Sequence, residues 1–274
     1  MLSSSSFRIM FLTAMSFFTA HAGSGAVTLT SVFNNVPCVS GLQTGWGYAC
    51  LIEGLTERVL FDTGADGDIL LSNLRRLGKD PADIDIIVLS HIHHDHIGGL
   101  DALLETNHHV VVYVPASFPP SMKESIRKRA LDLVEITQPT QIAPFIFTTG
   151  ELGHSIREQG LVLKTAKGLV VITGCAHPGI VNMVKRAKEF LKESIHLVMG
   201  GFHLSGAGDG AVLRIIDQMQ SLGVETVAPA IAPATGHVPF FVRPGAKIFS
   251  KAALVRPSKL GYKISLPPFW KLLF

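Results

Sequence analysis

Four histidines and one aspartate lie close together near residue 90, in the stretch Ser90-His91-Ile92-His93-His94-Asp95-His96-Ile97. Imidazole and carboxylate groups together are suitable ligands for Zn²⁺, Fe²⁺ or Mn²⁺. His91 and His93 are two residues apart, so an extended backbone directs both side chains to the same side. The spacing therefore predicts a metal site.

The elements around this cluster indicate how it is positioned. An apolar run, 84–89, precedes it, and Gly98-Gly99 and then leucines at helical spacing (Leu100, Leu103, Leu104) follow it. The cluster is thus expected where a buried strand ends and a helix begins, which is a common place for a site in an α/β protein. Apolar flanks and paired glycines are not expected of a solvated histidine-rich tract.

Two motifs carry a family resemblance. His91-x-His93-x-Asp95-His96, together with Asp62-Thr63-Gly64 after the apolar residues 59–61, resembles the signature of the metallo-β-lactamase fold. The resemblance extends from about residue 32 to residue 249. It implies an α/β protein with a four-layered αββα sandwich, whereas the sequence alone shows only mixed strands and helices.

The second half of the chain places further ligand types after predicted strands, in Gly174-Cys175-Ala176-His177 and in Gly200-Gly201-Phe202-His203. The resemblance implies that His91, His93 and His177 hold one metal ion. It implies that Asp95 and His96 contribute to a second ion beside it, and that Asp95 also orients the attacking water. Asp62 is expected to accept a hydrogen bond from a ligand imidazole.

Several other side chains have two interpretations each. His203 is either a ligand or substrate contact or a structural loop residue, and Cys175 is either a thiolate ligand or a buried thiol. His94 is expected to point away from the ligands, and His154 is a loop histidine with a metal or substrate role as its alternative.

The chain departs from its relatives near residue 233. Relatives carry a His-Cys-Thr-Gly element there, and its histidine usually completes the second metal site. The matching stretch keeps Thr235-Gly236 but has Pro233 at the histidine position. His203 or His237 would have to replace that ligand. The expectation is one firm and one weak site, occupied by one or two ions, most simply Zn²⁺, with Mn²⁺ or Fe²⁺ as alternatives.

Hydrophobic periodicity predicts the remaining elements. Expected strands cover 28–32, 48–52, 58–61, 84–89, 110–114, 161–165, 169–173, 195–199 and 225–228. Expected helices cover 69–77, 121–131, 180–191 and 211–222. The stretch 136–153, rich in proline and glycine, is expected to form loops at the rim of the substrate site.

Two long motifs narrow the resemblance to one branch of the fold, whose archaeal members are 7,8-dihydropterin-6-methyl-4-(β-D-ribofuranosyl)aminobenzene-5′-phosphate synthases. The motifs are 168–181 and Gly200-Gly201-Phe202-His203-Leu204. The leading prediction is a metal-dependent hydrolase of an ester, amide, lactone or phosphoester, because a bound metal lowers the pKa of water toward ~7. The alternatives are a transferase of the synthase type and a non-catalytic metal-binding relative.

The N-terminus resembles a secretory signal peptide. Arg8 precedes the apolar run 9–18, and Ala20-His21-Ala22 has small residues at the two selective positions before a cleavage point. The sequence thus predicts a signal peptide over 1–22 and a single domain over 23–274. It predicts a periplasmic or secreted protein, or a membrane-anchored one if the segment is not cleaved.

The composition limits the partners. The chain is 47% hydrophobic and 16% charged, with a net charge of +3, so a sizeable core is available and a nucleic-acid groove has no support. We expect a small-molecule substrate and no membrane span after cleavage, and the oligomeric state stays open. The three cysteines, Cys38, Cys50 and Cys175, allow one disulfide between the first two or free thiols.

Overall fold

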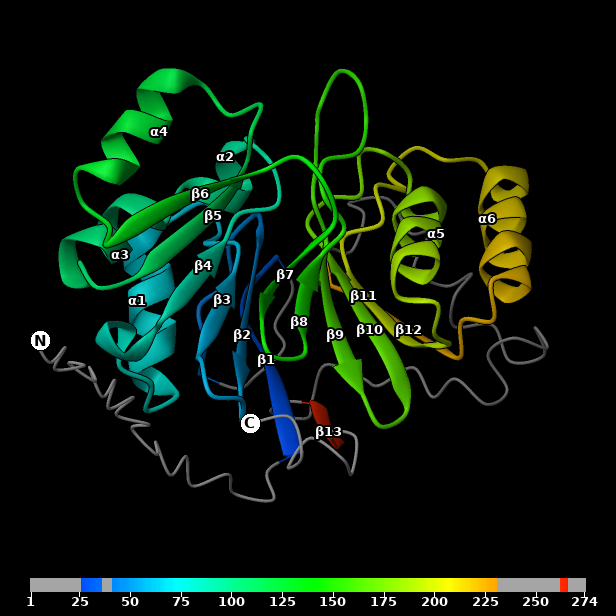
Figure 1. The fold of residues 1–274 in the computed structure, drawn as a ribbon, viewed down its shortest axis with the longest axis horizontal. Helices are drawn as coiled ribbons and strands as arrows, with labels where there is room; N and C mark the ends of the chain where they lie inside the picture. Colours follow the sequence, from blue (N-terminus) through cyan, green and yellow to red (C-terminus); the bar gives the residue numbers. More distant parts are fainter. Residues whose placement is uncertain (1–25, 36–40, 231–261, 266–274) are drawn as a thin grey trace, which may run out of the picture.

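The computed structural model describes residues 26–35, 41–230 and 262–265. Two β-sheets pack face to face, and helices cover the outer face of each sheet (Figure 1). This arrangement confirms the expected four-layered αββα sandwich. The N-terminal segment 1–22, Cys38, Pro233 and His237 lie outside the described residues.

Within the described residues, the first sheet has seven strands and contains the strand that leads into the histidine cluster. Neighbouring strands are antiparallel from β13 to β3 and parallel from β3 to β6. In sheet order they are β13 (Tyr262–Ser265), β1 (Ala26–Asn34), β2 (Tyr48–Glu53), β3 (Val59–Phe61), β4 (Ile86–Val88), β5 (Val111–Pro115) and β6 (Asp132–Ile136).

The second sheet has six strands in the part of the chain that the structure describes, all from its second half. The strands β12 to β10 are parallel, and β10 to β7 are antiparallel. In sheet order they are β12 (Thr226–Pro229), β11 (Ile195–Gly200), β10 (Gly168–Thr173), β9 (Leu161–Thr165), β8 (Ile146–Thr148) and β7 (Thr140–Ala143).

Helices complete the outer layers. The first sheet is covered by α1, α3 and α4, and the second by α5 and α6 (Figure 1). Their bounds, with the short helices η1 and α2 between them, are α1 (Gly67–Arg76), η1 (Pro81–Asp83), α2 (His94–Ile97), α3 (Leu100–Thr106), α4 (Pro120–Arg127), α5 (Ile180–Leu191) and α6 (Asp209–Ser221). None of the helices in the described part of the chain is long and apolar enough to cross a membrane.

Strand alternation builds three apolar layers. In β2, Cys50 and Ile52 point between the two sheets, while Ala49 and Leu51 point toward the helices. Because successive side chains of a strand face opposite sides, a strand that is apolar throughout needs cover on both faces. The near-continuous apolar strands therefore require the helix–sheet–sheet–helix order.

The sequence prediction matched most elements, was wrong in one region and did not include β13. The helix over 180–191 has the expected bounds, but the helix expected over 121–131 ends at Arg127. Residues 132–136 form β6, and the stretch 136–153 contains β7 and β8 where loops were expected. Pairing with a neighbouring strand decides that these residues form strands, because β6 forms a parallel ladder with β5 and β8 pairs with β9.

Candidate metal centre

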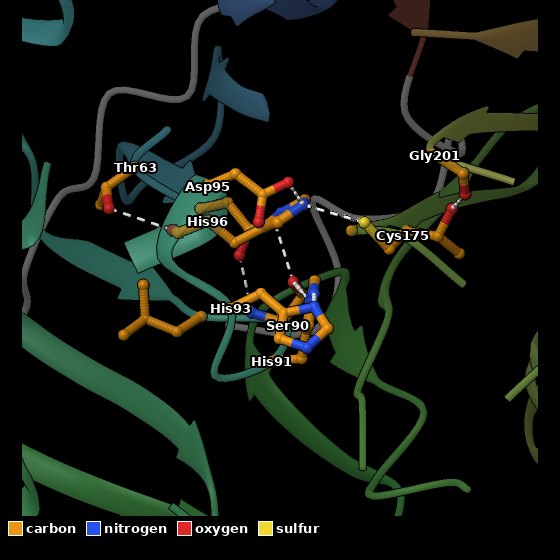
Figure 2. Close-up of polar contacts among 12 residues, drawn as sticks. Thr63, Ser90, His91, His93, Asp95, His96, Cys175 and Gly201 are labelled. Atoms are coloured by element: carbon orange, nitrogen blue, oxygen red, sulfur yellow. Dashed lines mark hydrogen bonds and ion pairs between the residues drawn. The ribbon is translucent and has the colours of Figure 1, made fainter. Parts of the chain in front are cut away.

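The candidate site lies where one loop from each sheet meets the other. Residues 90–96 follow β4 of the first sheet, and residues 174–177 follow β10 of the second. Figure 2 shows side chains of the two loops facing one another, with His96 directed at Cys175.

Three histidines bring their ring nitrogens to one point. The distance from His91 Nε2 to His93 Nδ1 is 3.2 Å, and that from His177 Nε2 to His93 Nδ1 is 3.0 Å. Tetrahedral zinc with Zn–N bonds of 2.0–2.1 Å separates its nitrogen ligands by about 3.3 Å. The three imidazoles therefore fit a divalent transition metal, and the sequence had selected all three.

The protonation of these histidines also suits metal binding. Burial lowers the pKa of His91 strongly, and the imidazoles of His96 and His177 lower it further. Burial and the neighbouring His203 lower the pKa of His177 to about 4. Both rings are neutral at neutral pH, and a neutral imidazole has the lone pair that a metal requires.

Asp62 orients two of the imidazoles. Its Oδ2 accepts a hydrogen bond from His96 Nδ1 at 2.7 Å and one from Ser90 Oγ at 2.8 Å. Its Oδ1 accepts the Ser90 backbone N–H at 2.7 Å. Ser90 Oγ in turn lies 2.9 Å from His91 Nδ1. Since the serine hydroxyl donates to Asp62, it accepts the His91 Nδ1–H, which leaves Nε2 of both rings free for a metal.

The sequence interpretation missed Ser90. Its hydroxyl is buried and connects Asp62 to His91. The available signal was its position, directly before the first histidine and directly after an apolar strand.

A second group of donors centres on His96. Its Nε2 lies 3.2 Å from Cys175 Sγ and 3.5 Å from Asp95 Oδ2. Burial opposes the charged form of His96, but the Asp62 carboxylate raises the pKa of the ring well above its usual value. Burial raises the pKa of the Cys175 thiol. The ligand atoms of His91, His96 and Cys175 all lie within 4.8 Å of one another. Asp95 borders this group but belongs to no such set of donors among the described residues.

The remaining predicted residues fall into different places. His203 is exposed, but its ring centroid lies 4.4 Å from that of His177. Its donor atom lies within 4.8 Å of those of Cys175 and His177. His94 is exposed and belongs to none of the donor groups found among the described residues. Cys50 is a buried free thiol.

Glu158 is a second residue that the sequence did not reveal. Its carboxylate is fully buried and accepts backbone N–H groups of the loop after β10. The donors are Gly174 N at 3.0 Å, Ala176 N at 2.9 Å and His177 N at 2.8 Å. Burial raises the pKa of Glu158 to about 7. An acidic residue three positions before an apolar strand was the signal for it.

The two loops approach so closely that one position excludes a side chain. A Cβ built on Gly174 would lie 2.1 Å from Ser90 Oγ and 3.1 Å from Asp62 Oδ2. The hydrogen bonds that orient His91 and His96 thus require glycine at this point of the opposite loop.

A cavity of about 460 Å³ lies beside His177, between the loop 152–155 and helix α5. It is half open and mainly polar. Its lining comprises Leu152, Gly153, His154, Ser155, His177, Pro178, Asn182, Lys185, Arg186 and Glu189.

The sequence has known relatives. Residues 47–192 match the family model of the metallo-β-lactamase superfamily. A protein of Methanocaldococcus jannaschii named 7,8-dihydropterin-6-methyl-4-(β-D-ribofuranosyl)-aminobenzene-5′-phosphate synthase is 31% identical over 240 residues, which cover 70% of this chain and 80% of the relative.

Solved structures share the fold. Tm1679, described as a metal-dependent hydrolase of the β-lactamase superfamily, matches with a TM-score of 0.65 and 26% identity, over 88% of this chain and 99% of its own. The metallo-β-lactamase fold protein YhfI of Bacillus subtilis matches with a TM-score of 0.61 and 15% identity, over 86% of this chain and 98% of its own. The second likeness concerns the fold alone.

Proposed function

Because the chain belongs to the metallo-β-lactamase superfamily, we propose that it is a metal-dependent hydrolase of small-molecule esters, amides, lactones or phosphoesters. The observation that carries the proposal is the convergence of three histidine nitrogens, with separations of 3.2 and 3.0 Å. The name of Tm1679, a metal-dependent hydrolase at 26% identity, supports it.

The residues have distinct roles in this proposal. A divalent metal held by His91, His93 and His177 would supply Lewis acidity and a water reactive at neutral pH. Burial opposes ionisation of Asp95, but the hydrogen bond with His96 lowers the pKa of its carboxyl. The ionised Asp95 can therefore orient water and accept its proton.

The cavity beside His177 is the proposed substrate site. Asn182, Lys185 and Arg186 of helix α5 line it, and these side chains favour a substrate with an anionic group near the scissile bond. The charge of Lys185 is partly balanced by the Glu189 carboxylate at 3.8 Å. A carboxylate-bearing ester or lactone, or a phosphoester, fits these charges best.

One observation favours a second function. The M. jannaschii relative at 31% identity is named as a synthase, and its resemblance covers 80% of its length. A transferase of that type would use the same donor cluster. A metal-binding protein without catalysis is the third alternative.

The test uses the full chain loaded separately with Zn²⁺, Mn²⁺ and Fe²⁺. Each form is assayed against neutral and anionic esters, lactones, amides and phosphoesters, and for formation of the compound named for the relative. Turnover in the hydrolysis panel supports the proposal, and synthase activity alone would replace it with the second function. Stoichiometric metal with no turnover in either assay would favour the non-catalytic alternative.

We also propose that the protein is exported, on the pattern of residues 1–22. We expect the mature chain to begin at Gly23. N-terminal sequencing of the protein from the producing cells would decide this, and a chain that retains Met1 in the membrane fraction would indicate an anchor instead.

A further inference from the structure

We propose that Cys175 is a thiolate ligand of a second metal ion, which it holds together with His96, while the carboxylate of Asp95 borders this position. The inference deepens the proposed function, since it concerns the same centre, but it predicts metal binding rather than turnover. The ligand set it assigns joins α2 of the first half of the chain to the loop after β10.

Distances support the pair. His96 Nε2 and Cys175 Sγ are 3.2 Å apart. Zn–N bonds of about 2.05 Å and Zn–S bonds of about 2.3 Å in a tetrahedral site separate the two ligand atoms by about 3.6 Å. The observed pair would need to move by less than about half an ångström.

The orientation of His96 is a second, independent observation. The side chain is completely buried, and its Nδ1 is used by Asp62. Its Nε2 therefore points at Sγ of Cys175 and at Oδ2 of Asp95, which lies 3.5 Å away. A thiol is only a weak hydrogen-bond partner. A cation bound to His96 Nε2 and Cys175 Sγ would replace this weak contact with two coordinate bonds.

The backbone around Cys175 fixes the sulfur in place. Glu158 accepts hydrogen bonds from the N–H groups on both sides of it, Gly174 at 3.0 Å and Ala176 at 2.9 Å. Ala176 has a φ of 62°, a left-handed conformation that an alanine adopts only when its surroundings impose it. The loop thus turns directly after the thiol, and His177 follows on the other side of the turn.

Cys175 also lies between the two parts of the centre. Its sulfur forms one set of donors with His91 and His96 and another set with His177 and His203. Within each set, the donor atoms lie within 4.8 Å of one another. A buried structural thiol would have apolar neighbours, as Cys50 does in the core between the sheets. The surroundings of Cys175 are those of a ligand.

Binding through sulfur is balanced by release of one proton. The thiol, whose S–H bond breaks, provides the electron pair of the new bond to the ion, and the proton leaves to solvent. A thiolate makes this position softer than the three-histidine position, so it favours Zn²⁺, Co²⁺ and Cd²⁺ over Mn²⁺.

The experiment is titration of the full chain with Co²⁺, followed by absorption spectroscopy. We expect two ions per chain and a sulfur-to-cobalt charge-transfer band in the near ultraviolet. The Cys175→Ser variant should lose the band and bind the second ion at least tenfold more weakly. Two bound ions without the band in the wild type, or an unchanged band in Cys175→Ser, would overturn the proposal.

A matched variant tests whether the band comes from the sulfur of Cys175 or from another cysteine. In the double variant Cys38→Ala and Cys50→Ala, Cys175 is the only thiol, so the band should keep its full intensity. Alanine keeps position 50 apolar within the core. Loss of the band in this double variant would assign it to another cysteine and contradict the proposal.

The wild type offers a measurement that does not depend on folding of a variant. Cd²⁺ should slow alkylation of Cys175 at least tenfold, as followed by peptide mass analysis, and equal rates with and without Cd²⁺ would contradict the assignment. The cobalt spectra and the activity assays together separate the two proposals. A thiolate band without turnover would contradict only the hydrolase proposal. Two bound ions and turnover without a thiolate band would contradict only the assignment of Cys175 as a ligand.

Discussion

At the scale of single residues, Asp62 connects both parts of the centre. One of its oxygens accepts from His96 directly and from Ser90, which in turn accepts from His91. The residue has a φ of 59°, in the left-handed region that aspartate and asparagine tolerate better than most residues. Asparagine is therefore a substitution that keeps the backbone while it removes the charge.

We predict that Asp62→Asn weakens metal binding by about 10- to 100-fold without unfolding the chain, because ligand rings depend on their outer hydrogen-bond acceptors. Competition with a chromophoric chelator would measure the affinity, and circular dichroism the fold. Asp83→Asn is the matched control, because the Asp83 side chain in helix η1 is exposed and pairs with Arg58 at the surface. Equal affinity in Asp62→Asn and the control would show that Asp62 does not support the ligands.

The adjacent histidines His93 and His94 provide a second comparison. His93 contributes a nitrogen to the three-histidine group, whereas His94 is exposed and outside it. We predict that His93→Ala lowers activity by more than about 100-fold and reduces bound metal, while His94→Ala retains both. Plasma emission analysis gives the metal content. The same loss in both variants would mean that a general disturbance of the loop is responsible.

At the scale of elements, the loop after β10 is held by one carboxylate rather than by regular pairing. Glu158 precedes β9, and its two oxygens accept three N–H groups of residues 174–177. Gln159, the next residue, donates from Nε2 to the Leu89 carbonyl at 2.9 Å. Two consecutive side chains therefore tie the start of β9 to both loops of the centre.

We predict that Glu158→Gln destabilises the fold by about 1–3 kcal/mol, because the amide NH₂ would face a backbone donor in a buried site. The displaced His177 should also weaken metal binding. Thermal unfolding and chelator competition would measure the two effects. Glu193→Gln, which removes a partly exposed ion pair with Lys164, should change little. A fully stable Glu158→Gln with normal metal affinity would show that the carboxylate does not hold the loop.

At the scale of the whole molecule, the centre joins the two sheets. His91 and His93 follow β4 of the first sheet, and His177 follows β10 of the second. A metal bound to all three would link the halves of the sandwich, and it would bind the folded state more tightly than the unfolded one. Its affinity therefore adds to the stability of the entire fold.

We predict that removal of metal with a chelator lowers the midpoint of thermal unfolding by on the order of 10 °C, for free metal about 1,000-fold above the dissociation constant. Differential scanning calorimetry with and without EDTA would measure the shift. His93→Ala should show a much smaller one. An equal midpoint with and without metal would mean that the ion does not bridge the sheets.

The sequence predicted the strongly periodic parts of this fold and the ligands that are local in the chain. The helix over 180–191 and the histidines of 91–96 needed only short-range patterns. β6, β7 and β8 were missed because pairing decides their structure: β6 pairs with β5, β7 with β8, and β8 with β9. Ser90 and Glu158 were missed because their partners lie 28 and 16 to 19 residues away, which no local spacing reveals.

The distance along the chain between contacting ligands has a consequence for the order of folding. His93 and His177 are 84 residues apart, and His96 and Cys175 are 79 residues apart. Contacts of such high contact order form late, because closing a long loop costs entropy before any contact is gained. In a refolding experiment, the capacity to bind Co²⁺ should therefore appear only in the slowest phase, after most helical circular dichroism has returned.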